Sequence, residues 1–171
     1  MKNLLLALGF LSVTTFSFSQ APEYDDLKVL FADADYEKLI KKAEGYTLKD
    51  KTKKHVLPYI WLSKGLYKMS VSDNINEKYK NSYKSSIKNM GKAIKYDLKY
   101  NNMATIPDHE EFLHELQTSL QIRVENEMSG ETTGGFKKGY SWALSYKKIS
   151  VNLAAINFVS GACKYFSGDK P

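Results

Sequence analysis

The sequence is poor in cysteine and in arginine, and both scarcities limit what the protein can do. Cys163 is the only cysteine among 171 residues, so no disulfide forms within one chain and stability must come from an apolar core. The apolar neighbours of Cys163 predict a buried thiol. A disulfide between two chains is the alternative in an oxidising compartment. Arg123 is the only arginine. Because recognition of backbone phosphates and base edges relies on the guanidinium fork, no nucleic-acid partner is expected.

The sequence also lacks the motifs of common enzyme classes, including Gly-x-Ser-x-Gly, the Walker loop and Gly-x-Gly-x-x-Gly. His109 and His114 are one residue too far apart for the zinc motif His-Glu-x-x-His, so their imidazoles diverge by about 140° around a helix. Glu111 and His114 match half of a di-iron site, but no second Glu-x-x-His pair is present. We therefore predict no catalytic, metal-ligating or cofactor-binding residue and no cofactor.

The first residues have the three parts of a secretory signal peptide. A lysine near the start is followed by an apolar stretch over 4–13 and by small residues at Ser17 and Ser19. A membrane-spanning helix needs about 20 apolar residues, and this apolar stretch is shorter. We predict that residues 1–19 are cleaved, that Gln20 becomes the new terminus, and that the protein is periplasmic or secreted. The ending Ser-Phe-Ser-Gln resembles signals common in Bacteroidota.

Helical periodicity dominates the rest of the chain and predicts an all-α fold. Apolar residues recur at intervals of three and four between residues 76 and 100, which places on one side of a helix Tyr79, Tyr83, Ile87, Met90, Ile94 and Leu98. The same periodicity predicts further helices over 33–46, 57–69 and 107–128, the last of them capped by Thr105. We expect a single domain over 20–171 with about five antiparallel helices and a flexible loop near 129–135.

The stretch from Phe136 to Phe166 is the most apolar part that follows the leader. No residue between Ile149 and Cys163 is charged. A helix of that length extends about 22 Å, which is shorter than the hydrocarbon core of a membrane at about 30 Å. We therefore predict a central helix that is contacted on most sides, rather than a transmembrane segment. A short strand is the alternative that the local pattern allows.

The net charge of +6 alternates along the chain, with net values of −4 over 22–36, +10 over 37–100, −6 over 101–131 and +5 over the remainder after the leader. Opposite charges can bring helices together, or the basic middle can attract an acidic partner. The polar side of the predicted helix over 76–100 carries the residues expected to bind an anion, Lys84, Lys88, Lys92 and Lys95. Ordinary solvation of these lysines is the other interpretation.

Two of the predicted helices resemble parts of a tetratricopeptide repeat. Residues 35–43 are similar to the second helix of the repeat, and the spacing of its first helix is reproduced by Tyr59, Leu62, Ser63 and Leu66. An internal recurrence relates Tyr36, Ile40 and Lys41 to Tyr83, Ile87 and Lys88, with an offset of 47 residues in place of the family's period of about 34. The resemblance covers about residues 33–97.

The resemblance implies a helical scaffold that binds another protein through a groove. The side chains expected to form that groove are Tyr59, Leu62, Leu66, Tyr79 and Tyr83. With the predicted leader, this favours a non-catalytic adaptor that docks onto another envelope protein, by analogy as an accessory of an outer-membrane or secretion assembly. The alternative is a binder of an anionic envelope polymer or lipid through the Lys-rich segment 37–100. An enzyme with an unrecognised site is the third interpretation.

Overall fold

The computed structural model describes residues 23–72, 76–130, 134–150 and 153–168, and all regular structure in these ranges is helical. The elements in chain order are α1 (Asp25–Ala32), α2 (Tyr36–Leu48), α3 (Val56–Ser70), η1 (Glu77–Tyr79), α4 (Ser82–Tyr100), η2 (Ile106–His109), α5 (Glu110–Met128), α6 (Gly135–Lys147) and α7 (Ala154–Phe166), where η marks a short 3-10 helix. The predicted all-α fold is confirmed. These ranges contain seven α-helices in place of the about five that we expected.

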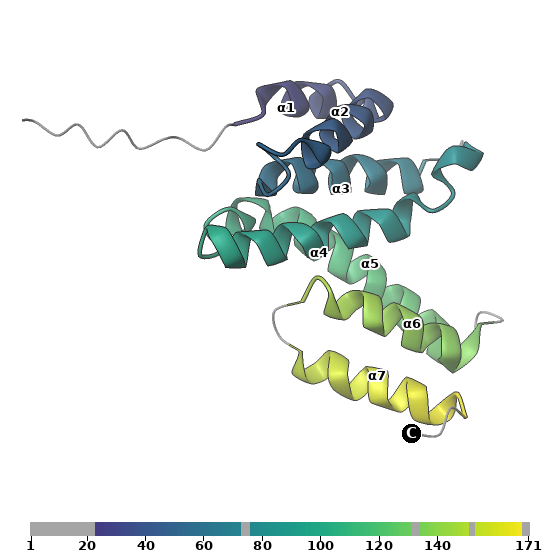
Figure 1. Cartoon of the computed structure of the whole chain (residues 1–171). Coiled ribbons are helices and arrows are strands. Elements are labelled where there is room, and N and C mark those ends of the chain that lie inside the picture. Colours follow the sequence, from purple (N-terminus) through teal and green to yellow (C-terminus); the bar gives the residue numbers. More distant parts are fainter. Residues whose placement is uncertain (1–22, 73–75, 131–133, 151–152, 169–171) are drawn as a thin grey trace, which may run out of the picture.

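The predicted leader, its cleavage before Gln20 and part of the predicted loop near 129–135 lie outside the described residues. The helices stack in chain order, with α1 at one end and α7 at the other (Figure 1). α3 packs between α2 and α4, while α6 packs between α5 and α7. Within each of the groups α1 to α4 and α5 to α7, a helix is therefore held mainly by its neighbours in the chain, while the two groups meet through one shared apolar cluster.

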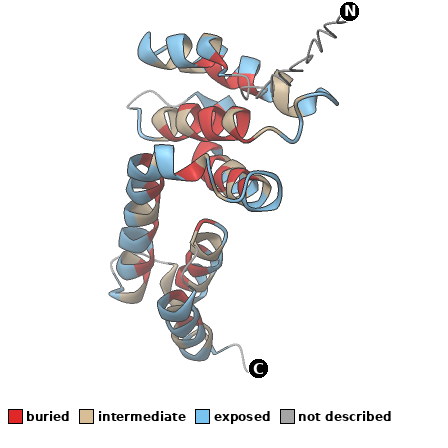
Figure 2. Ribbon diagram, turned by 90° about the vertical axis from the view of Figure 1, so that its left-hand side faces the viewer, coloured by how far each residue is buried: buried red, intermediate tan, exposed pale blue. Residues whose placement is uncertain are grey.

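The most buried helix of the stack is α3. Its apolar residues surround the whole helix, which is the pattern of a helix covered on several sides. One side, with Trp61, Leu62 and Leu66, packs on α1 and α2, and the other side, with Tyr59 and Ile60, belongs to a larger cluster that reaches through α4 and α5 to α7. Figure 2 shows this concentration of buried residues in the upper half of the stack.

The prediction of a central helix within 149–163 is wrong. Ile149 lies in the turn after α6, and α7 begins only at Ala154. α7 packs on α6 at the end of the stack, and no described element covers its outer side, so Phe158 and Tyr165 are 79% and 78% exposed. The strand that we held open as an alternative does not occur in the described ranges.

α4 begins later than predicted, because residues 77–79 form the separate turn η1. Its predicted apolar side is buried at Tyr83, Ile87 and Met90, whereas Leu98 is exposed. The chain after α4 is held by the fully buried Asp97. Its carboxylate accepts hydrogen bonds from the N–H of Thr105 (3.0 Å) and of Ile106 (2.7 Å). This buried carboxylate, rather than the predicted Thr105 side chain, satisfies the backbone before α5.

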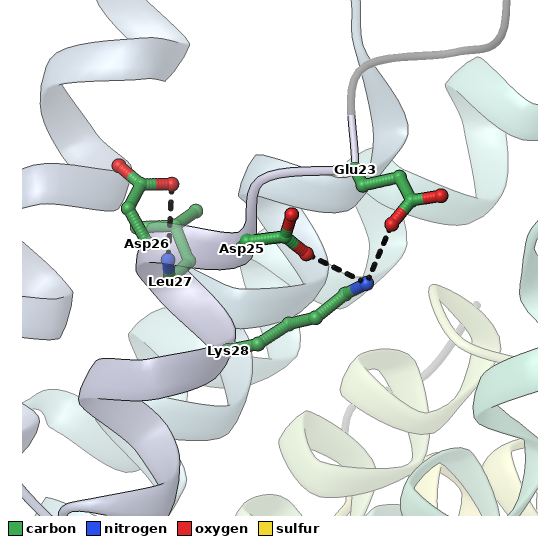
Figure 3. Close-up of polar contacts among 5 residues, drawn as sticks. All are labelled: Glu23, Asp25, Asp26, Leu27 and Lys28. Carbon is green, nitrogen blue, oxygen red and sulfur yellow. Dashed lines mark hydrogen bonds and ion pairs between the residues drawn. The ribbon is translucent and has the colours of Figure 1, made fainter.

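Opposite charges join different helices at three places, one of which, between Lys138 of α6 and Glu127 of α5, lies near the C-terminal end. Lys42 of α2 pairs with Asp26 of α1 at 2.9 Å, and Lys68 of α3 pairs with Glu115 of α5 at 3.3 Å. Within the N-terminal segment, Lys28 lies between Asp25 at 3.1 Å and Glu23 at 3.4 Å, while Asp26 accepts from the N–H of Leu27 (Figure 3). Such exposed pairs contribute little stability, about 0–1 kcal/mol each. Much of the acidic charge around α1 is nevertheless balanced locally.

Candidate functional site

The five residues predicted to form a groove are buried between helices. Tyr59 and Tyr83 belong to the larger core cluster, and the smaller cluster around α2 contains Leu62, Leu66 and Tyr79. None of the five is more than 7% exposed. The spacing therefore located helix faces that pack against other helices. Leu66 and Tyr79 reach the wall of a cleft between α2, η1 and α4, and Tyr83 reaches a smaller cleft at the start of α4, but little of any of these side chains is exposed. Partner binding through these five residues stays a prediction.

The four predicted anion-binding lysines are all exposed on α4, but they do not converge on one point. Lys88 and Lys92 line a cleft of about 610 Å³ between α2, η1 and α4, where Lys41 and Lys78 also lie. Lys84 belongs to a different, smaller cleft at the start of α4. Lys95 lines neither cleft. Anion binding by this helix stays a prediction, and its strongest positions are Lys88 and Lys92.

The smaller cleft lies where α4 begins and has a volume of about 200 Å³. Three cations line it, namely Lys80, Lys84 and Arg123, the last of which comes from α5. The guanidinium of Arg123 lies 4.0 Å above the ring of Tyr83, so its position is fixed by stacking on an aromatic face. Local sequence patterns did not reveal this cleft, since Arg123 lies two elements further along the chain.

Lys64 and His109 form a half-buried pair on the side of α3 that faces α5. The Lys64 ammonium lies 3.4 Å from Nδ1 of His109 and 4.8 Å from the centre of the Trp61 ring. Burial, reinforced by Lys64, lowers the pKa of His109 to about 4, so this imidazole is neutral at pH 7 and accepts a hydrogen bond from the ammonium. Burial likewise lowers the pKa of Lys64. The pair holds α3 against the start of α5.

A second imidazole, that of His55, contacts the Tyr24 hydroxyl at 2.6 Å on the wall of a cleft of about 550 Å³. Burial, followed by the neighbouring Tyr46 and Asp26, raises the pKa of Tyr24 to about 12. The phenol is therefore protonated at neutral pH, and its hydroxyl shares a hydrogen bond with Nδ1 of His55. This contact ties the residue before α1 to the start of α3. It provides neither an activated nucleophile nor a general base at Tyr24.

No protein-family model, curated protein or solved structure matches this chain. Within the described residues, no group of three His, Cys, Asp or Glu side chains is placed to hold a metal ion. In the same ranges, no helix is both long enough and apolar enough to cross a bilayer.

The outer face of α7 is an exposed apolar surface. Its exposed positions carry no charged residue and are Ala154, Ala155, Asn157, Phe158, Gly161 and Tyr165. Phe158 and Tyr165 are seven residues apart, which places both rings on one side of the helix. Phe166 is also exposed, and its ring stacks at 5.1 Å on Phe136 of α6. Contiguous exposed aromatic rings are characteristic of interaction surfaces.

An apolar cleft continues this surface toward α5. It has a volume of about 630 Å³ and is lined on its apolar side by Val124, Met128, Ile156 and Val159. Glu125 of α5 also lines the cleft, whereas the surrounding segments 134–150 and 153–168 contain five lysines and no acidic residue. Lys138 is paired at 3.0 Å with the buried Glu127 of α5. The C-terminal end of the described stack therefore combines exposed aromatic rings with a positive charge.

Proposed function

We propose that this protein is a non-catalytic helical scaffold, exported to the periplasm or secreted, that binds an acidic amphipathic segment of another envelope protein along α7. The observation that carries the proposal is the uncharged outer face of α7, on which Phe158 and Tyr165 are almost fully exposed. A terminal helix of a stacked array needs a polar outer face to stay soluble by itself. An apolar face at that position is therefore suited to be covered by a partner.

The charges around α7 indicate the chemistry of that partner. Because the segments 134–150 and 153–168 carry lysines and no acid, a second copy of this face would bring like charges together. A segment that presents apolar side chains to Phe158 and Tyr165 and carboxylates to Lys147 and Lys164 would be attracted instead. Burying each of the two aromatic rings contributes about 1.5–3 kcal/mol, so each is expected to matter about tenfold or more in affinity.

The stacking of α2 on α3 and of α6 on α7 supports a tetratricopeptide-like architecture as part of this proposal, since such scaffolds are built from adjacent helix pairs. The proposal differs from the sequence-based prediction in the position of the partner surface. That surface lies on α7 rather than on the buried side chains of α3 and α4. The predicted leader supports export, which N-terminal sequencing of the protein from the envelope fraction tests directly, with Gln20 as the expected first residue.

Site-specific photo-crosslinking in the native envelope tests the partner surface. A benzoylphenylalanine placed at Phe158 should crosslink to one protein, through a segment that is acidic and amphipathic. The matched control position is Leu48, an equally exposed apolar side chain at the end of α2. The double variant Phe158→Ser with Tyr165→Ser should lose the complex, whereas Leu48→Ser should keep it. Equal crosslinking from both positions, or crosslinking of Phe158 to a second copy of this chain, would refute the proposed surface.

A second candidate function is the binding of an anionic envelope polymer in the cleft between α2 and α4. The observation in its favour is the convergence of Lys41, Lys78, Lys88 and Lys92 on that cleft, against a single acid, Glu44. Salt separates the two functions by degree, because binding of a polyanion weakens steeply as ionic strength rises, while the α7 contact loses only its charge attraction and keeps the contribution of its buried aromatic rings. Loss of capture at moderate salt, together with full sensitivity to Lys88→Gln, would favour the polymer.

A further inference from the structure

We propose that the cleft at the N-terminus of α4 is a binding site for a single phosphate group, which is a function separate from partner binding on α7. The site is built from Lys84 and Ser82 at the start of α4 and from Arg123 of α5. Its volume of about 200 Å³ is below the range of about 300–1,000 Å³ that holds most small-molecule ligands, so the cleft suits an ionic group rather than an extended ligand.

The first turn of α4 has unused capacity for an anion. The first N–H groups of a helix have no acceptor within the helix, and together with the helix dipole they act as about half a positive charge. In α4, the N-cap residue Asn81 does not cap the turn with its side chain, and the first turn contains no acidic residue. An external anion can therefore take the place that a capping carboxylate occupies in other helices.

Ser82 gives an independent indication of a missing ligand. Its side chain is 3% exposed, and its hydroxyl is one of two buried side-chain polar atoms of the described residues that have no hydrogen-bond partner. A buried hydroxyl without a partner is costly, and polar groups of this kind usually pair in the functional state. Ser82 lines the small cleft, where rotation about its Cα–Cβ bond can direct the hydroxyl toward an occupant.

The cations of the cleft complete the site. Arg123 and Lys84 form no ion pair within the described residues, whereas Lys80 is paired with Glu77. The Arg123 guanidinium is held over Tyr83, so its fork is oriented before any ligand binds. Donors thus come from a helix terminus, a hydroxyl, an ammonium and a guanidinium. A tetrahedral dianion with four oxygens can accept from all of them, whereas a carboxylate has only two oxygens to offer.

An NMR titration of the whole protein at constant ionic strength tests the site. Inorganic phosphate and glycerol 3-phosphate are added in separate arms, and the backbone amides of Ser82, Tyr83 and Lys84 are followed. Both ligands should give saturable chemical-shift changes at these amides. The ligand with the lower dissociation constant shows whether the site prefers a free phosphate or a phosphate monoester headgroup. Acetate at the same concentrations should bind about tenfold more weakly, because it satisfies fewer donors.

Three variants separate this site from general attraction to lysines. Arg123→Gln should weaken phosphate binding about tenfold or more, since the charge-assisted fork is lost. Ser82→Ala should weaken binding while leaving the melting temperature unchanged or higher, because an unpaired buried hydroxyl is removed. Lys95→Gln removes an equal charge from α4 outside the cleft and should change the affinity less than about twofold. Shifts that do not saturate, acetate binding as tight as phosphate, or equal losses for Lys95→Gln and Arg123→Gln would each overturn the proposal.

Discussion

Replacing Asp97 by alanine tests how the connection between α4 and α5 is held. The carboxylate is fully buried, and its oxygens accept from two backbone N–H groups, those of Thr105 at 3.0 Å and Ile106 at 2.7 Å. The N–H of Ile106 is buried in this bond, whereas that of Thr105 is closer to solvent. Alanine removes both acceptors at once and leaves at least the Ile106 donor without any partner.

The expected loss follows from these two bonds. A hydrogen bond to a charged group contributes about 1.5–3 kcal/mol, and water can replace part of the Thr105 bond, so Asp97→Ala should lower the free energy of unfolding by about 3 kcal/mol. For a protein of this size, that corresponds to a fall of about 6–12 °C in melting temperature. Asp97→Asn keeps one acceptor oxygen but loses the charge, so its loss should be about half as large.

Urea and thermal unfolding, followed by far-UV circular dichroism, give these differences directly. Hydrogen exchange adds a local measurement, since the amides of Thr105 and Ile106 should lose protection in Asp97→Ala. Asp50→Ala is the control, because the Asp50 carboxylate is exposed and pairs only with Lys53, so the change should stay below about 0.5 kcal/mol. If the two alanine variants unfold at the same urea concentration, the account of Asp97 given above is incorrect.

Two further predictions concern acid stability and the contact of α4 with the end of α6. Burial and Lys64 lower the pKa of His109 to about 4. Between about pH 6.5 and 4 the unfolded chain therefore binds a proton that the folded chain does not, so the free energy of unfolding should fall as the pH is lowered through that window. Calorimetric melting temperatures of His109→Gln should fall less over this range, and an equal fall would contradict the assignment. At Gly91, an added Cβ would lie 2.9 Å from the carbonyl oxygen of Lys148, so Gly91→Ala should lose about 1 kcal/mol or more in urea unfolding. Gly45→Ala is the control, because an added Cβ there meets no atom within 4 Å, and the free energy of unfolding should rise by up to about 1 kcal/mol from helix propensity. If Gly91→Ala were also stabilised, the backbones of α4 and the end of α6 would not be held this close.

The helices could be predicted where apolar spacing extends over several turns. The predicted segments 57–69 and 107–128 correspond closely to α3 and to η2 with α5. α1 was not predicted, because its eight residues open with two aspartates and are too few to establish a period. Its burial depends on α2 and α3, against which Leu27 packs, and no pattern within α1 specifies that contact.

Spacing also does not reveal which helix face remains open. The uncharged run in 149–163 was interpreted as a core helix, yet Phe158 and Tyr165 face outward because the described stack ends at α7. The spacing of tyrosines and leucines in α3, η1 and α4 predicts a groove, but these side chains also pack between helices, and spacing alone does not separate the two roles. The pairs that the structure brings together, such as Lys64 with His109 and Tyr24 with His55, are separated by 45 and 31 residues, so only the packing of helices makes them neighbours.

The buried position of Cys163 makes the reaction rate of its thiol a measure of how often α7 opens. The sulfur is fully buried under Gly139, 3.3 Å from where a Cβ of that residue would lie, and burial raises the pKa of the thiol. A thiol reagent can reach it only after α7 lifts away from α6. Since the helices are held by their neighbours, this opening requires less free energy than global unfolding and leaves α1 to α5 in place. Any reaction of this thiol, including a disulfide between two chains, therefore requires α7 to detach first, and the reaction rate depends on how often α7 detaches.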